Sequence, residues 1–296
     1  MKFFLIALTL LLGLIFPASA CDLCGCSTTG NGLGVLPQYQ ASFVGMRWQM
    51  AGFRYPAYHT QDRFQQAEVW GRFYPGRRVQ LMGFVPYRWH TRQAEDGSLS
   101  HAHGLGDASV MARFSVIHSP DSVKTGFRHT LLVGGGIKAP TGAWQSHQAE
   151  NLPANFQLGT GSWDALLNAQ YQVRWNAWGF SPQMNLRRNY TNPIDFRYGD
   201  QLAAGITAYA WVNSPRWSWI WMPYLGWNGE WMGRDVNKEF YQTDTGGQGQ
   251  YLSLGSEFFT RKLATGINCQ LPVSQSYGGG EIIAQPRLMV HFSMWL

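Results

Sequence analysis

The stretch from Gly159 to Trp175 reads GTGSWDALLNAQYQVRW, and its alternation decides the fold class. From position 163 onward, every second side chain is apolar: Trp163, Ala165, Leu167, Ala169, Tyr171, Val173 and Trp175. The positions between them are mostly polar: Asp164, Leu166, Asn168, Gln170, Gln172 and Arg174. Because successive side chains of a strand point to opposite faces, this pattern predicts one long strand with an apolar face and a polar face. A tilted strand crosses a bilayer in roughly 9–11 residues, so this one is long enough to span it, with an aromatic residue at each end.

The same pattern recurs along the chain and predicts about twelve strands. They cover roughly residues 39–53, 65–74, 79–91, 107–117, 129–139, 163–175, 178–190, 202–212, 217–232, 251–259, 263–271 and 287–296. The linkers after odd-numbered strands are the longer ones: about 55–64, 92–106, 140–161, 191–201, 233–250 and 272–286. Short periplasmic turns and long external loops are typical of outer-membrane barrels. We therefore expect an all-β, transmembrane, antiparallel up-and-down barrel with both chain ends on the periplasmic side.

The alternative fold is a soluble β-sandwich or a lipocalin-like barrel. Strands in such folds are shorter, around 5–6 residues, and their outer faces are polar. Here the apolar face is continuous on nearly every strand, while charged residues share the other face. Charged residues make up only 14% of the chain, against about 25% in soluble domains. Aromatic residues make up 15%, and no apolar run after residue 20 approaches the length of a spanning helix. The pattern favours a barrel in the bacterial outer membrane.

The first 20 residues, MKFFLIALTLLLGLIFPASA, are typical of a secretory signal peptide. Lys2 is the charged region, and Ala18-Ser19-Ala20 is an A-x-A cleavage site. The apolar run is too short for a transmembrane helix. Residues 21–38, rich in Cys and Gly, are predicted to form a periplasmic segment or a plug in the lumen, and residues 39–296 the barrel. The formal net charge of +6 is spread without a basic run, which argues against a nucleic-acid partner.

The chain ends in a further alternation. Apolar residues occupy every second position up to the end: Leu288, Val290, Phe292, Met294 and Leu296. Such an ending resembles the assembly signal of bacterial outer-membrane barrels. The last residue here is Leu296, whereas an aromatic residue is usual at that position. We expect the barrel assembly machinery and the lipid bilayer to be partners of the chain.

Four motifs, in this order, resemble a known family. They are GLGD (104–107), GIKAPTG (136–142), LGTGSWD (158–164) and QLPV (270–273). On a barrel pattern they are similar to the outer-membrane transporter barrels known as the meta-pathway phenol-degradation family, distant relatives of fatty-acid and aromatic-hydrocarbon channels. The resemblance covers roughly residues 35–296, and the CDLCGC sequence at residues 21–26 is similar to a Bacteroidota-type subgroup. The resemblance implies an outer-membrane channel without catalytic residues.

Alternation places several charged side chains in the lumen, where they are expected to set selectivity for a small-molecule solute. These are Glu68, Arg72, Asp107, Arg113, Lys138, Asp164 and Arg174. Lys138, Asp107 and Asp164 fall near the external rim, where unpaired charge is costly, so we expect them to pair. Such a cluster either braces the barrel wall or contacts the solute, and bracing is the commoner use.

Two groups could bind a metal. Cys21, Cys24 and Cys26 could hold Cu(I) or Zn, although a CxxCxC sequence lacks a fourth ligand, and a disulfide or acylation of Cys21 is an alternative. Cys269 should point to lipid. The residues His90, His101, His103, Glu95 and Asp96 could form a surface metal site, but their spacing favours an ordinary loop.

We predict a channel or transporter that passes a small hydrophobic, aromatic or metal-related solute by passive or facilitated diffusion, narrow and partly plugged. We expect no enzyme, because the chain has no G-x-S-x-G, P-loop, dinucleotide or haem motif. The alternatives are a non-conducting binding or assembly protein, using loops 140–161 and 233–250, and, with less support, a membrane-embedded hydrolase. The tryptophans of residues 217–232 either face lipid or line a path for an apolar ligand, and their parity favours lipid.

Overall fold

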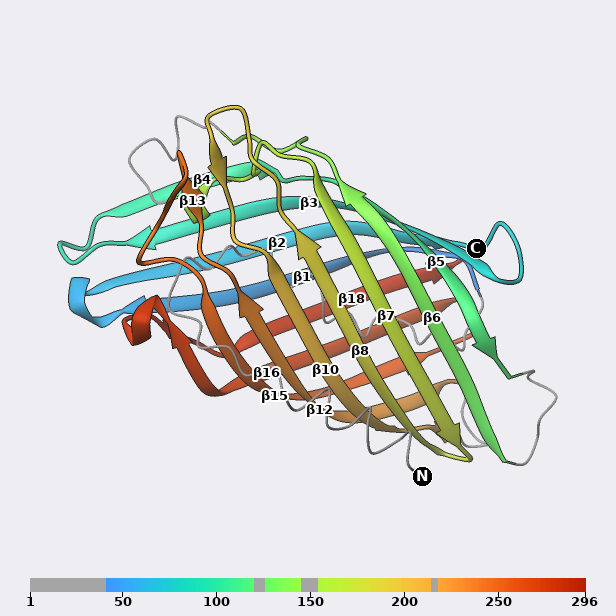
Figure 1. Cartoon of the computed structure of the whole chain (residues 1–296). Coiled ribbons are helices and arrows are strands. Elements are labelled where there is room, and N and C mark those ends of the chain that lie inside the picture. The colour runs from blue at the N-terminus through green and yellow to red at the C-terminus, as the bar shows by residue number, and fades with distance from the viewer. Residues whose placement is uncertain (1–40, 120–125, 145–153, 214–217) are drawn as a thin grey trace, which may run out of the picture.

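Twelve long strands form one closed antiparallel barrel in the computed structural model, which describes residues 41–119, 126–144, 154–213 and 218–296 (Figure 1). The strands are β1 (Phe43–Tyr55), β2 (Thr60–Phe73), β3 (Val79–Gln93), β5 (Ser109–His118), β6 (Phe127–Lys138), β7 (Asp164–Trp175), β8 (Trp178–Arg188), β10 (Gln201–Ala210), β12 (Ile220–Met232), β15 (Gly247–Phe259), β16 (Leu263–Tyr277) and β18 (Arg287–Trp295). Each pairs with the next in chain order. The predicted fold class and strand number are confirmed.

The barrel closes where β18 pairs with β1. Their register runs from Phe43 opposite Trp295 to Met50 opposite Leu288. Figure 1 shows this seam, with red β18 beside blue β1. Because every long strand has a neighbour on both sides, the barrel leaves no long strand with an open edge.

The connections contain several short elements. They are β4 (Leu99–Leu105), β9 (Phe196–Arg197), β11 (Val212–Asn213), β13 (Val236–Asn237), β14 (Phe240–Tyr241), β17 (Ile283–Ala284) and the 3-10 turns η2 (Pro56–Tyr58), η4 (Ala154–Phe156) and η5 (Gly278–Gly280). β4 pairs with the external half of β3, from Tyr87 to Gln93. β9, β13 and β14 form a small separate sheet. Across the described ranges, no helix has the length and apolarity to cross a membrane.

Four predicted linkers were wrong in extent, among them 233–250, which β15 enters by beginning at Gly247. β1 ends at Tyr55 and β2 begins at Thr60, so the expected linker 55–64 is reduced to a tight turn. The expected linker 92–106 contains β4, and β16 continues to residue 277, into the expected linker 272–286. These segments looked like loops because they are polar on both faces. Inside the barrel, however, a polar inward side chain can find a partner on a neighbouring strand.

The two faces of the sheet have the polarity expected of a membrane barrel. Outward residues such as Met46 (58% exposed) and Leu167 (56%) are apolar, whereas inward Glu68 is fully buried. Exposed aromatic residues, including Trp175 and Trp178, mark the end of the barrel where β1 begins and β18 ends. An apolar exterior around a polar interior suits lipid, because the closed ladder satisfies the backbone hydrogen bonds that lipid cannot.

Candidate functional site

The lumen is packed with polar side chains that pair across strands. On neighbouring β1 and β2, Arg47 Nη2 lies 2.5 Å from Glu68 Oε1, and both side chains are almost fully buried. Between β15 and β18, which are not adjacent, His291 Nε2 lies 2.9 Å from Glu257 Oε2. These contacts lie inside the wall because the residues have inward parity on their strands. Paired charges inside the barrel avoid the cost of an isolated buried ion.

The predicted rim cluster is formed as expected. Lys138 Nζ lies 2.6 Å from Asp107 Oδ2 and 2.6 Å from Asp164 Oδ2. Asp107 also accepts hydrogen bonds from the backbone N–H groups of Thr160 (2.8 Å) and Gly142 (3.0 Å). The cluster therefore joins the three motifs GLGD, GIKAPTG and LGTGSWD, and it anchors both ends of the β6–β7 connection to the barrel.

Part of that connection folds against the inner face of β3. Arg88 Nη1 donates to the carbonyl of Leu158 at 2.7 Å, and Arg88 Nε donates to Gln66 at 3.1 Å. The ring of His90 contacts the carbonyl of Phe156 through Nδ1 at 3.1 Å. Phe156 and Leu158 are fully buried. An external connection thus contributes side chains to the lumen.

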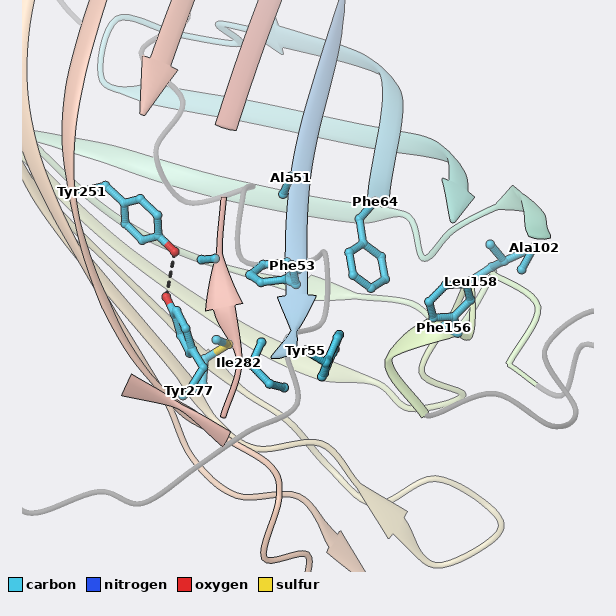
Figure 2. Close-up of a cluster of buried hydrophobic side chains, with 12 residues drawn as sticks. Ala51, Phe53, Tyr55, Phe64, Ala102, Phe156, Leu158, Tyr251, Tyr277 and Ile282 are labelled. Atoms are coloured by element: carbon cyan, nitrogen blue, oxygen red, sulfur yellow. Dashed lines mark hydrogen bonds between the residues drawn. The ribbon is translucent and has the colours of Figure 1, made fainter. Parts of the chain in front are cut away.

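An apolar cluster fills the external end of the lumen (Figure 2). Its members are Ala51, Phe53, Tyr55, Phe64, Ala102, Phe156, Leu158, Met232, Tyr251, Tyr277, Ile282 and Ala284. The hydroxyls of Tyr251 and Tyr277 lie 2.8 Å apart, the contact dashed in Figure 2. Both hydroxyls also contact Glu230, which forms a two-pronged ion pair with Arg287 at 2.6 and 2.8 Å. We call the apolar residues named at the start of this paragraph the external cluster.

A second apolar cluster fills the periplasmic end. Its buried members are Phe43, Trp70, Tyr209, Met222, Tyr224, Phe259 and Ala264. Phe43 and Trp70 pack edge to face with ring centroids 4.5 Å apart. We call this set the periplasmic cluster. The two clusters lie at opposite ends of the polar lumen, so a solute that crosses the barrel has to pass both.

A cavity of about 80 Å³ lies in the lumen. Phe84, Met111 and Met232 supply apolar lining, and Arg187 and Glu230 supply charge. A mostly apolar pocket with a few converging polar groups is the usual form of a small-molecule site. This cavity lies inside the barrel and offers a small solute both apolar contacts and charged groups.

The outer wall carries a separate apolar groove of about 450 Å³. Val69, Val85, Val110, Ile137 and Trp163 are among the residues that line it. Gly71 lies opposite Gly83 within the lining, so the wall lacks side chains there. The groove opens on the outer face of the barrel wall and not into the lumen.

The other predicted lumenal charges lie apart from the rim cluster, and of the three arginines Arg72 and Arg113 are buried. Arg113 donates to Gln80 at 2.5 Å and to Gln170 at 3.1 Å. Arg72 packs over the ring of Phe43, 4.8 Å from its centroid, beside the periplasmic cluster. Arg174 is only partly buried and lies over the ring of Trp211 at 5.1 Å, near the periplasmic end. The predicted residues therefore form several local networks.

Several buried ionic residues were not predicted, and four of them pair on the strands β12, β15 and β18. They are Glu230, Glu257, Arg287 and His291. Their signal was present, because Arg287 and His291 alternate with the outward residues Leu288 and Val290. Alternation gave the face of each residue but not its partner on another strand, so the pairing could not be predicted.

The three histidines of the candidate loop site do not come together, in agreement with the ordinary loop that their spacing favours. His90 points inward while His101 and His103 are exposed, because they lie on opposite faces of the β3–β4 hairpin. Among described residues, no group of three or more His, Cys, Asp or Glu side chains could hold a metal ion. Cys21, Cys24 and Cys26 lie outside the described residues. Cys269 is a free thiol with the outward parity of Ile267 and Leu271, as predicted.

The external loops are joined by a buried carboxylate. Asp235 Oδ1 accepts a hydrogen bond from the Gly199 N–H at 2.6 Å, and the Asp235 N–H donates to Thr245 at 2.8 Å. Burial raises the pKa of Asp235 to about 7, although the Gly199 hydrogen bond and Arg197 act in the opposite direction. The connections β8–β10 and β12–β15 are therefore linked through a group that titrates near neutral pH.

Comparison with solved structures supports the barrel fold. An outer membrane channel from Pseudomonas putida F1 superposes with a TM-score of 0.65 at 13% identity, over 88% of this chain and 97% of that one. The β domain of the Bordetella autotransporter BrkA superposes with a TM-score of 0.51 at 13% identity, over 86% of this chain and 100% of that one. No family model matches the chain, and no curated protein matches it.

These observations define the class of the protein. The chain forms a closed twelve-stranded β-barrel with a lipid-facing exterior, a fold shared with bacterial outer-membrane barrels. Its place is the bacterial outer membrane, as the alternation predicts.

Proposed function

We propose that the barrel lets a small hydrophobic or aromatic solute cross the outer membrane by passive or facilitated diffusion. The observation that carries the proposal is the lumenal cavity, whose apolar lining meets Arg187 and Glu230. The two apolar clusters favour an apolar solute over a hydrated one, since a hydrated solute would lose water there. The resemblance to aromatic-hydrocarbon channels agrees with this solute class.

Flux measurements in proteoliposomes test the proposal. We expect the purified chain to speed entry of a small aromatic hydrocarbon more than entry of a sugar of similar size. Met111→Trp should fill the cavity and lower aromatic flux, because Met111 lines it. Val110→Trp is the matched control, because its neighbour Val110 points outward and is 49% exposed. Aromatic flux equal to that of empty liposomes would refute the proposal.

The N-terminal segment, residues 21–38, lies outside the described residues and is the second part of the proposal. We propose that residues 21–38 enter the lumen from the periplasmic side as a plug. Deleting residues 22–38 should then raise single-channel conductance in planar bilayers. An unchanged conductance would count against the plug while leaving the aromatic flux test intact.

A metal-related solute is the alternative cargo, and it rests on Cys21, Cys24 and Cys26. Titration of a 21–38 peptide with Cu(I) or Zn under reducing conditions tests it. Binding only at millimolar concentrations would remove this alternative. The aromatic flux assay does not depend on these cysteines.

The proposal assigns no catalytic step. The competing functions are a membrane-embedded hydrolase and a non-conducting binding or assembly protein. Incubating the purified chain with phospholipid and measuring released fatty acid tests for the hydrolase. A chain that shows neither flux nor hydrolysis would favour the binding or assembly protein.

A further inference from the structure

Two exposed arginines lie together on the outer wall near the external end. The pairing places Arg63 of β2 opposite Gly52 of β1 and opposite Thr91 of β3, and Arg54 of β1 opposite Gln61 of β2. Arg54 and Arg63 are therefore diagonal neighbours, about 7–8 Å apart on the sheet. Both have outward parity and are exposed. Their guanidinium groups can reach one multivalent ligand.

Two histidines extend the same surface onto β4. Thr91 pairs with His101, and Trp89 pairs with His103, so the row through Arg63 continues directly to His101. Both histidine side chains are exposed. We call Arg54, Arg63, His101 and His103 the basic patch.

The patch has no acidic neighbour on the outward face of its own strands, and the exposed carboxylates Glu95 and Asp96 lie beyond it in the β3–β4 turn. The outward positions of β1, β2, β3 and β4 carry no Asp or Glu. Within the described part of the chain, Arg54 and Arg63 form no ion pair. Arg188, elsewhere on the external end, is by contrast paired with Asp200. The basic patch therefore presents positive charge that suits an anionic ligand.

The patch lies at the level of lipid headgroups. Trp89 lies in the row of His103, and Tyr87 lies one row closer to the membrane centre; their rings lie 4.7 Å apart. Below them, the outward residues of β2 and β3 become apolar, as at Val69 and Val85. Aromatic residues mark the boundary between hydrocarbon and headgroups. The patch is at the barrel end opposite the start of β1 and the end of β18, where the longer connections lie, so it faces the external leaflet.

The apolar groove lies on the same wall, lower on β2 and β3. Its lining includes Val69, Val85 and Val110, with Trp163 at its side. A ligand with charge at one end and hydrocarbon at the other would contact both surfaces. That combination describes a lipid whose headgroup carries negative charge.

We propose that the basic patch binds the phosphates of a multiply phosphorylated lipid in the external leaflet, with its acyl chains along the apolar groove. Arginine is suited to phosphate because its planar guanidinium donates two parallel hydrogen bonds. Two arginines with two flanking histidines match a headgroup with more than one phosphate better than a single phosphodiester.

Lipid binding to the purified full chain tests the proposal. Native mass spectrometry would measure binding of lipid A with two phosphates, of the same lipid after phosphatase treatment, and of phosphatidylglycerol. Each arginine near a charged lipid surface contributes about 1 kcal/mol, or about fivefold in affinity. We expect Arg54→Gln and Arg63→Gln each to weaken lipid A binding about fivefold, and the double variant about 30-fold.

The control removes two charges from the opposite end. Arg261→Gln with Lys262→Gln changes the exposed β15–β16 turn and should leave lipid A binding within twofold of the original chain. Heat-dependent mobility on gels verifies that each variant is folded. If the double variant does not fold, the two single variants test the proposal in its place.

The outcomes separate the sources of binding. Dephosphorylated lipid A should bind the original chain as weakly as phosphorylated lipid A binds the double variant. The proposal is overturned if the double variant keeps its affinity, if dephosphorylation has no effect, or if the turn variant loses affinity equally. Equal affinity for phosphatidylglycerol would overturn the assignment to a multiply phosphorylated headgroup.

Discussion

Lys138 is the one ammonium group shared by two buried carboxylates, those of Asp107 and Asp164. Replacing it with Met leaves Asp107 and Asp164 close together without their shared cation. Breaking a buried pair in this way costs about 3–5 kcal/mol, so we expect Lys138→Met to lower the heat- or urea-unfolding midpoint clearly. The fraction of heat-modified barrel on gels is the measurement. Lys262→Met, in the exposed β15–β16 turn, is the control and should change little.

A triple variant distinguishes lost charge balance from lost packing. Asp107→Asn and Asp164→Asn combined with Lys138→Met remove both carboxylates that the single change leaves unpaired. We expect this variant to recover part of the lost stability. If it is less stable than Lys138→Met alone, charge balance is not what the cluster supplies.

Asp235 makes loop packing depend on pH. Its pKa in the folded protein is about 7, whereas a free Asp titrates near 4. The folded loop therefore holds a proton that the opened loop releases, so the loop contact is strongest below about pH 4 and weakens as pH rises to about 7. Beyond the intrinsic effect of pH, hydrogen exchange of the Gly199 amide should lose protection between pH 5 and pH 8.

The variant Asp235→Asn removes the titration and keeps an oxygen that can accept from Gly199. Its protection should change little between these two pH values. A profile that falls as steeply as that of the original chain would show that another group controls the loop.

At the scale of the strand, β6 and β5 approach closely at a glycine. Gly136 has inward parity, and a Cβ there would lie 2.8 Å from Cα of Met111 on β5. We expect Gly136→Ala to push the strands apart and to destabilise the barrel by about 1–3 kcal/mol, as overpacking does. Gly83→Ala on β3 is the matched control, because nothing lies within 4 Å of a Cβ at that position. Equal unfolding midpoints for both variants would contradict this account.

Strand prediction succeeded where one face is apolar and failed where both faces are polar. The strand 163–175 was predicted to within a residue because its outward side chains are all apolar. The start of β2 was missed because Asp62 is polar, as a loop residue would be. Arg92 on β3 lies 2.5 Å from Asp62 and makes the strand favourable there. A partner on a neighbouring strand is not visible in local sequence.

The candidate site shows the same limit. Parity correctly gave the inward face of Glu68, Lys138 and Asp164, and the cost of unpaired buried charge predicted the pairing of Lys138 with the two aspartates. The lumenal cavity could not be predicted, because it depends on how side chains from several strands fit together. Nor could the entry of Phe156 into the lumen, since it belongs to a connection whose path is set by distant contacts.

At the scale of the molecule, two apolar clusters lie in series along the lumen. Apolar constrictions resist the passage of hydrated ions. We expect Phe156→Ala in the external cluster or Trp70→Ala in the periplasmic cluster to raise ion conductance only modestly, because the other cluster still limits the current. The double variant should raise it by more than the sum of the two single effects, measured in planar bilayers.

The matched control changes an aromatic residue outside the lumen. Trp175→Ala lies on the outward face and should leave conductance unchanged. A full increase from Trp70→Ala alone would mean that the external cluster does not limit the current.

The pairing of β1 with β18 determines when the barrel can close during folding. Since β1 completes its pairing only with β18, the first strand to be made has to wait for the twelfth. Every earlier intermediate exposes two open edges, one on β1 and one on the newest strand, and open edges invite pairing with other chains. Contacts between such distant parts of a chain also form slowly. The closed barrel has no open edge for such pairing, but the folding chain keeps two open edges until β18 pairs with β1.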